Sequence, residues 1–165
     1  EQLVQIIGEN VSVRRAVRFI SQGGEVGGYL HANDKLGALV ETRGANDLLG
    51  KEIAMLVAAM SPMVVSNDQM PEHVLRAERK IYEAQALESG KPESVINKMV
   101  DGRLQKFVAE SSLLDQAFVR EPSNKVGDLL KQANAQCRRF IRFEVGEGIE
   151  KKDEDFAAEV AAQLD

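Results

Sequence analysis

The stretch EVGGYLHANDKLGALVETR, residues 25–43, decides the fold. It contains two runs with the composition of strands, residues 25–32 and 36–43, and the pair Asn33-Asp34 lies between them. Asn and Asp tolerate left-handed backbone angles and hydrogen-bond to nearby backbone groups, so this pair favours a tight turn. The stretch therefore predicts two antiparallel strands joined by a short connection.

Upstream of this pair lies VSVRRAVRFIS, residues 11–21, which is rich in β-branched residues and alternates in character. Gly23-Gly24 follows it, as expected at a turn, so the run predicts a further strand and a three-stranded antiparallel meander. The glycine-rich GGEVGG, residues 23–28, lies between two predicted strands. It cannot direct a helix N-terminus at a phosphate, and we interpret it as a structural turn.

Downstream, a helix is predicted from the caps Asn46 and Asp47 to the stop at Ser61-Pro62. Apolar residues recur within it at helical spacing, and we expect this face to cover one side of the meander. These residues are Leu48, Leu49, Ile53, Leu56 and Val57.

Residues 71–108 predict a projecting antiparallel helical hairpin. The first arm begins at Pro71, Gly90-Lys91-Pro92 forms the break, and the second arm follows. We expect Ile81 and Val100 to be buried in the seam between the arms. The full apolar stripes are Val74, Ala77, Ile81 and Ala84 in the first arm, and Ile96, Met99, Val100, Leu104, Phe107 and Val108 in the second.

The last third of the chain predicts a return to the sheet. A short helix from Pro122-Ser123 leads into residues 137–145, which alternate and are expected to form a returning strand. The predicted fold class is α+β: a three-stranded antiparallel meander with a returning strand, packed helices and the projecting hairpin. We expect a core sheet subdomain at 1–70, the hairpin at 71–112, a return to the sheet at 113–146, and an acidic C-terminal helical module at 147–165.

Composition limits the class of protein. Of the 165 residues, 44% are hydrophobic and 28% are charged, which is typical of a soluble globular chain. No apolar run reaches the ~20 residues that cross a bilayer, and no export signal is recognisable, so we expect a cytoplasmic protein that does not bind a membrane. The net charge of −5 argues against direct nucleic-acid binding. Residues 147–165 carry all of this charge. Because the sequence begins at Glu1 within an apparent helix, we expect a fragment.

The chain offers little chemistry for catalysis. It has no phosphate-loop motif, and His31 and His73 lie in no metal-ligand spacing. Cys137 is the single cysteine, so it cannot form an internal disulfide, and its alternating surroundings predict a half-buried, inert thiol. We therefore expect no metal, no cofactor and no active site, and interpret the chain as a partner-binding protein, not an enzyme.

Several motifs resemble the C-terminal part of bacterial elongation factor Ts. The longest is FIRFEVGEGIEK at residues 140–151, followed by DFAAEVAA at 155–162. Others occur in the same order as in the family, so the resemblance covers nearly the whole chain. They are GEN at 8–10, VRR at 13–15, GGYLH at 27–31, SGKP at 89–92, KMVDGRLQKF at 98–107 and EPSNKVGDLLK at 121–131.

The resemblance implies a protein that binds the GTPase elongation factor Tu and promotes release of its GDP so that GTP can enter. His31 matches a family histidine that contacts the third domain of the GTPase, and Gly8 and Asn10 match positions near the same surface. Phe156 and Val160 match the module that packs on the nucleotide domain. The family's Thr-Asp-Phe-Val exchange element does not occur in residues 1–165, so this piece is expected to supply binding surfaces without it.

Other interpretations stay open. His31 can instead be a turn residue hydrogen-bonded within the sheet, and Phe156 and Val160 can pack on the body of the chain itself. Family members can also form dimers, and unpaired strand edges favour a homodimer through the core sheet. A second functional hypothesis is a structural or dimerisation subunit within a larger assembly such as a replicase. A third, an enzyme of unknown type, would need a cleft with perturbed titratable groups.

Overall fold

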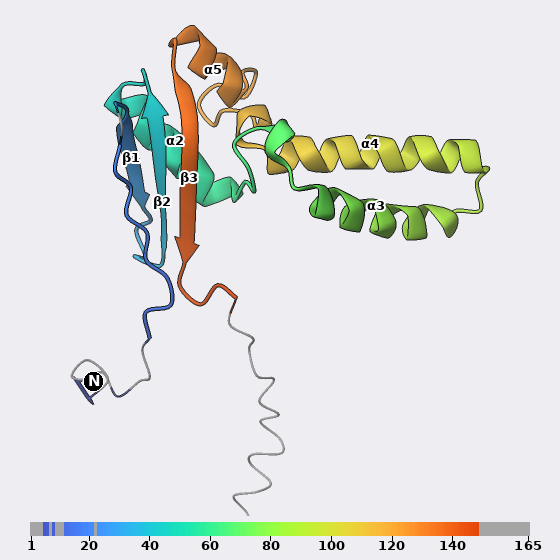
Figure 1. The fold of residues 1–165 in the computed structure, drawn as a ribbon, viewed down its shortest axis with the longest axis horizontal. Helices are drawn as coiled ribbons and strands as arrows, with labels where there is room; N and C mark the ends of the chain where they lie inside the picture. Colours follow the sequence, from blue (N-terminus) through green and yellow to red (C-terminus); the bar gives the residue numbers. More distant parts are fainter. Residues whose placement is uncertain (1–4, 7, 9–11, 22, 149–165) are drawn as a thin grey trace, which may run out of the picture.

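The computed structural model describes residues 5–6, 8, 12–21 and 23–148 (Figure 1). Its sheet has three antiparallel strands in the order β1-β2-β3, which are Glu25–Leu30, Leu36–Arg43 and Gln136–Glu144. The pairing Gly28 with Leu39, and Leu39 with Ile141, fixes the register. The α+β class and the returning strand are confirmed.

The predicted strand at residues 11–21 is wrong, because the described part, residues 12–21, contains no strand. The third strand of the sheet is the returning one. Val13, Val17 and Ile20 are 88, 46 and 63% exposed, so the alternation of this segment buries neither of its faces. A β-like composition indicates fit to a half-buried pleated surface, and this segment lacks that burial.

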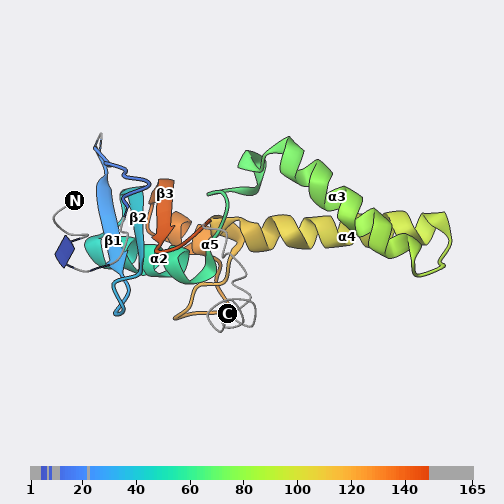
Figure 2. The ribbon, with the colours of Figure 1, turned by 90° about the horizontal axis from the view of Figure 1, so that it is seen from below.

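Helix α2, Asp47–Met60, covers one face of the sheet, as predicted (Figure 2). It begins where the Asn46 side chain accepts a hydrogen bond from the Leu49 backbone N–H at 2.8 Å. Ile53 and Val57 of the helix are fully buried against Val40 of β2. Helix α5, Val126–Gln132, and the turn Leu113–Asp115 complete this core.

Helices α3, Glu72–Leu87, and α4, Glu93–Ser111, lie side by side and extend away from the sheet (Figures 1 and 2). A small core of Ala86, Ile96 and Val100 joins them, with Tyr82 packed against it. The base of the hairpin meets the body where the Leu113 N–H donates to the Val64 carbonyl at 3.0 Å.

The predicted seam is correct for α4 and wrong for α3. Val100 is 1% exposed, but Ile81 is 48% exposed and faces solvent. The inner side of α3 instead carries Tyr82 and Arg79, and Arg79 pairs with Asp101 of α4 at 2.7 Å. Counting apolar residues missed this side because it mixes a tyrosine with charged residues.

The two positions therefore make a matched pair for a stability test. Val100→Ala should lower the free energy of unfolding of the hairpin by about 2 kcal/mol, because it removes two buried carbons and leaves a cavity. Ile81→Ala should change it by less than about 1 kcal/mol, since half of that side chain is in water. Limited proteolysis, monitored by cleavage within residues 71–112, and circular dichroism would measure the stability of both variants. Equal losses for the two variants would contradict the described packing.

Candidate partner-binding site

His31 directly follows β1 and starts the connection to β2. Its backbone N–H donates to the Leu36 carbonyl at 2.8 Å, and its own carbonyl accepts from the Asp34 N–H at 2.9 Å. Asp34 adopts a left-handed conformation with φ of 57°, as the turn prediction requires. Two backbone hydrogen bonds thus fix the main chain at this exposed histidine.

The His31 ring is also oriented by Tyr29. The Tyr29 hydroxyl lies 2.9 Å from His31 Nδ1, and the ring centroids are 6.1 Å apart. Tyr29 itself packs against the main core. The hydrogen-bonded alternative for His31 and an exposed contact role are therefore compatible, because the hydrogen bond engages Nδ1 and the side chain is exposed.

The other predicted site residues are only partly described. Gly8 has a positive φ of 74°, and a Cβ added to it would meet no atom within 4 Å. Asn10, Phe156 and Val160 lie outside the described residues. The structure therefore locates His31 and Gly8 and leaves the assembly of the five residues as a prediction.

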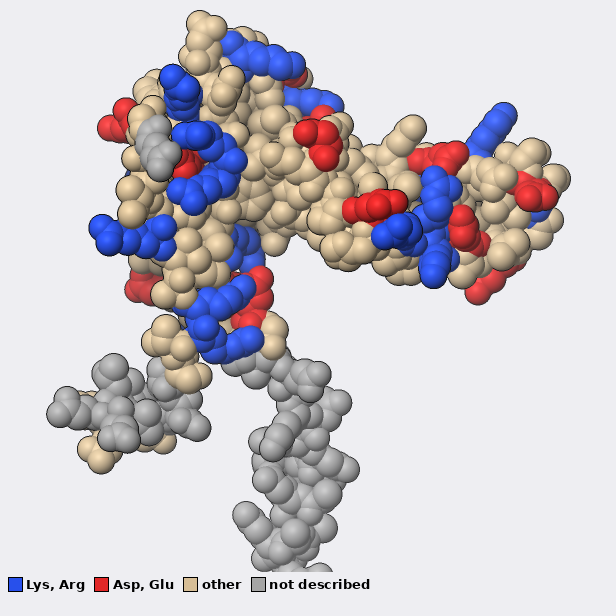
Figure 3. All heavy atoms as spheres, viewed as in Figure 1, with Lys and Arg blue, Asp and Glu red and all other residues tan. Residues whose placement is uncertain are grey.

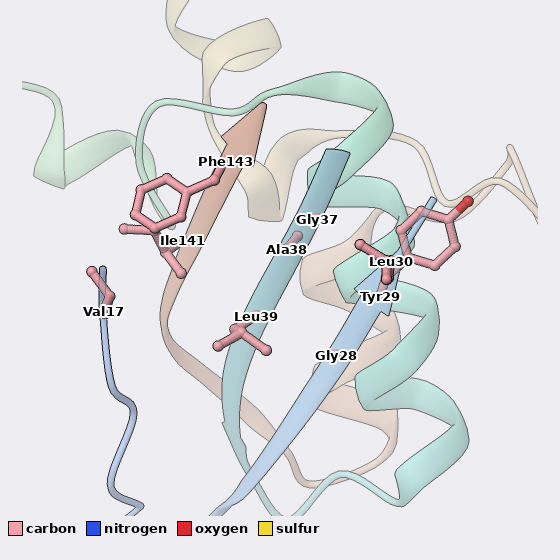
Figure 4. A pocket seen from close by; sticks show the side chains of 9 residues that line it. All are labelled: Val17, Gly28, Tyr29, Leu30, Gly37, Ala38, Leu39, Ile141 and Phe143. Atoms are coloured by element: carbon pink, nitrogen blue, oxygen red, sulfur yellow. The ribbon is translucent and has the colours of Figure 1, made fainter. Parts of the chain in front are cut away.

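The sheet face opposite α2 contains an apolar hollow of about 490 Å³ (Figure 4). Its side chains come from β1, β2 and β3 and from the segment 12–21, and the sequence analysis did not single it out. The alternation of residues in β3 could have indicated this hollow, since it places Ile141 and Phe143 on one face of the sheet. The lining residues are Val17, Gly28, Tyr29, Leu30, Gly37, Ala38, Leu39, Ile141 and Phe143.

Several Lys and Arg side chains lie on the side of the sheet seen in Figure 3. Arg139 lies 4.4 Å from the Phe19 ring centroid and 2.6 Å from the Glu41 carboxylate, which Arg138 approaches at 3.7 Å. The Glu41 side chain is almost fully buried, so its charge is stabilised by these guanidinium groups. Two arginines of β3 therefore balance a buried carboxylate of β2.

Cys137 shows no sign of reactivity. Burial raises the pKa of its thiol to about 12, against a weaker opposing effect of a backbone hydrogen bond at Arg139. Because the thiolate is the reactive form, a thiol with this pKa is inert near neutral pH. This agrees with the half-buried thiol expected from the sequence.

The described residues offer neither a site for a metal ion nor a membrane-spanning helix. Within residues 5–6, 8, 12–21 and 23–148, no group of three His, Cys, Asp or Glu side chains is placed to hold a metal ion. None of the helices in that part of the chain is long and apolar enough to cross a bilayer.

Comparison with known proteins identifies the family. The model of the family described as elongation factor TS matches residues 1–147. The elongation factor Ts of Hahella chejuensis is 55% identical over 164 residues, covering 99% of this chain and 57% of that relative. Those of Alkalilimnicola ehrlichii and Legionella pneumophila strain Paris are 52 and 50% identical, with 99% of this chain and 56% of each relative covered. The chain thus spans a little more than half the length of these relatives, and it belongs to the elongation factor Ts family.

Proposed function

We propose that this chain binds the GDP-bound form of elongation factor Tu and provides docking surfaces for nucleotide exchange. Family membership over 99% of the chain is the observation that carries this proposal. It favours an exchange factor over a structural subunit of a larger assembly. Such a factor acts by binding a protein and catalyses no chemical reaction of its own.

His31 is the first contact residue in this proposal. The exposed ring is preorganised by two backbone hydrogen bonds of residue 31 and by the Tyr29 hydroxyl, so little conformational freedom is lost on binding. Gly8 and Asn10 are assigned to the same surface, and Phe156 and Val160 to a second contact through the acidic C-terminal module.

The test is a titration of purified elongation factor Tu·GDP with the 165-residue chain. His31→Ala should weaken the affinity by about 1–2 kcal/mol, or roughly 5- to 30-fold, the usual cost of removing a contact residue. His73→Ala is the matched control, because His73 is exposed on α3 and has no assigned contact. Equal affinities of the two variants would remove His31 from the site, and failure of the unaltered chain to bind would refute the proposal.

The apolar hollow supports the second association proposed for this chain, a homodimer through the core sheet. Leu30 is 64% exposed beside it, and a two-fold axis would place the same patch of each copy against the other. Leu30→Glu should therefore yield monomers in sedimentation or light scattering. Leu48→Glu, at a 56% exposed position on α2, should leave the dimer intact. A monomeric unaltered chain at all concentrations would rule the dimer out.

A further inference from the structure

The neutral His31 ring has two possible tautomers, and its contact with Tyr29 decides between them. The Tyr29 hydroxyl lies 2.9 Å from His31 Nδ1. Either the hydroxyl donates to a bare Nδ1 and the ring proton is on Nε2, or Nδ1–H donates to the hydroxyl oxygen and Nε2 is bare. The first tautomer presents a hydrogen-bond donor to a partner, and the second presents an acceptor.

The first arrangement gives the stronger hydrogen bond. A phenol hydroxyl donates well but accepts poorly, because its oxygen lone pairs are delocalised into the ring, whereas a bare imidazole nitrogen is a good acceptor. Among the described residues, no other group bonds to the Tyr29 hydroxyl, so its proton is available to His31 Nδ1. The ring proton of His31 is therefore on Nε2.

The Tyr29 ring is itself held by the sheet. Side chains alternate along a strand, so Tyr29 lies on the face of β1 that Gly27 presents to α2. Its partner across the sheet is Ala38, which is 4% exposed. Neither neighbour has a side chain larger than a methyl group, which leaves room for the ring to pack against the main core. A half-buried ring thus brings its hydroxyl to the exposed His31 from a fixed place.

The opposite edge of the imidazole is open. Residues 31–35 are all exposed, and within the described part of the chain no atom hydrogen-bonds to His31 Nε2. The turn is also held closed, since the Lys35 N–H donates to Asn33 Oδ1 at 3.0 Å in addition to the two backbone bonds of residue 31. The Nε2–H group is therefore an oriented donor that faces water at the end of β1.

We propose that Tyr29 is a positioning residue that holds His31 in the Nε2–H tautomer, so that the ring donates a hydrogen bond to an oxygen acceptor on the GTPase. This inference rests on the proposed function. A backbone carbonyl, an amide oxygen or a carboxylate can accept this bond, whereas an ammonium, a guanidinium or a backbone N–H cannot. Fixing the ring before binding lowers the entropy lost in the contact. Tyr29 thus raises affinity through His31 without touching the partner.

The tautomer is measured on the free 165-residue chain by nitrogen-15 NMR of its two histidines at about pH 8.5, where histidine is neutral. His31 should show a bare Nδ1 and a protonated Nε2. Tyr29→Phe keeps the ring and removes only the hydroxyl, so both nitrogens should move toward averaged shifts. His73 is the internal reference, because it is exposed on α3 and no described residue bonds to its ring. A protonated Nδ1 in the unaltered chain, or no change in Tyr29→Phe, would overturn the inference.

Binding to elongation factor Tu·GDP tests the effect on affinity. Tyr29→Phe should weaken binding about three- to fivefold, the cost of ordering a freed side chain. Tyr82→Phe removes the same oxygen from the hairpin and should leave binding unchanged. In a chain that already carries His31→Ala, Tyr29→Phe should cause no further loss, because its effect passes through the imidazole. Equal losses with and without His31, or no loss in either chain, would contradict a positioning role.

The acceptor on the partner is tested in the complex. The bound chain, labelled at its histidines, should keep a protonated His31 Nε2, and this proton should exchange with water more slowly than in the free chain. A bare Nε2, or a proton that exchanges as fast as before, would overturn the acceptor. Failure of the unaltered chain to bind would refute the proposed function and the acceptor with it, whereas the tautomer is decided on the free chain alone.

Discussion

Gly27→Ala should lower the free energy of unfolding by about 3 kcal/mol, the upper end of the usual cost of overpacking. A Cβ on Gly27 would lie 2.4 Å from the carbonyl carbon and 2.5 Å from the carbonyl oxygen of Gly50. Both are backbone atoms of α2, so β1 or the whole helix must move to accept one methyl group. Urea unfolding followed by circular dichroism would measure the change.

Gly28→Ala is the control, because the two glycines are neighbours in β1 and point to opposite faces. The nearest atom to a Cβ on Gly28 is the Leu39 Cδ2 methyl at 3.3 Å, which is the flexible end of a side chain. We expect a change within about 1 kcal/mol there. If Gly28→Ala were the more damaging variant, the assignment of faces in β1 would be wrong.

This contact changes the interpretation of the GGYLH motif. Its first glycine has a structural role, since it allows α2 to approach the sheet, while Tyr29 packs against the core and hydrogen-bonds the exposed His31 just after the strand. Because Gly27→Ala displaces β1 or α2, it should also shift the turn at His31, which directly follows β1. One motif combines a packing requirement with a proposed contact.

Local signals were sufficient for the elements whose partners lie nearby in sequence. Asn33-Asp34 predicted the turn between β1 and β2, and Asn46 predicted the start of α2. The alternation after Cys137 predicted β3, although its partner β2 lies about 100 residues earlier. A period of two that buries one face is a strong signal even for a distant pairing.

Other features depended on contacts that no local pattern encodes. Residues 12–21 have the composition of a strand, but they meet the sheet through arginine contacts: Arg15 with Glu147 and Phe143, and Arg139 of β3 with Phe19. The prediction of the α3 residues in the seam was wrong, because Tyr82 and Arg79 face α4 and Ile81 does not. The close approach of Gly27 to Gly50 was also missed, because two glycines give no hydrophobic signal.

The candidate site was predictable only through resemblance. Nothing in the spacing of His31 distinguishes a contact residue from an ordinary turn residue, and the contacts of Arg14 and Arg15 with Glu147 join residues more than 130 positions apart. Asn10, Phe156 and Val160 lie outside the described residues and remain predictions. The division at 1–70, 71–112, 113–146 and 147–165 likewise stays a proposal.

The largest functional difference from a full-length elongation factor Ts is expected in nucleotide exchange. Assayed alone, residues 1–165 should bind elongation factor Tu but raise the rate of GDP release less than about threefold, which lowers the barrier to release by less than about 0.7 kcal/mol. A factor shifts its partner only through different affinities for the nucleotide-bound and nucleotide-free states. The exchange element Thr-Asp-Phe-Val, which the family places beside the magnesium, does not occur in these residues.

Contacts far from the nucleotide hold both states nearly equally, and equal affinity shifts no equilibrium however tight the binding. Two measurements on the same chain separate binding from exchange: its affinity for the GDP-bound and the nucleotide-free GTPase, and the release rate of a fluorescent GDP at saturating chain. A full-length elongation factor Ts serves as the control that release can be accelerated. Release by residues 1–165 at that control's rate would place the exchange element within this sequence. The hairpin would then be the first region to mutate, because its own core of Ala86, Ile96 and Val100 is separate from the core that Tyr29 packs against.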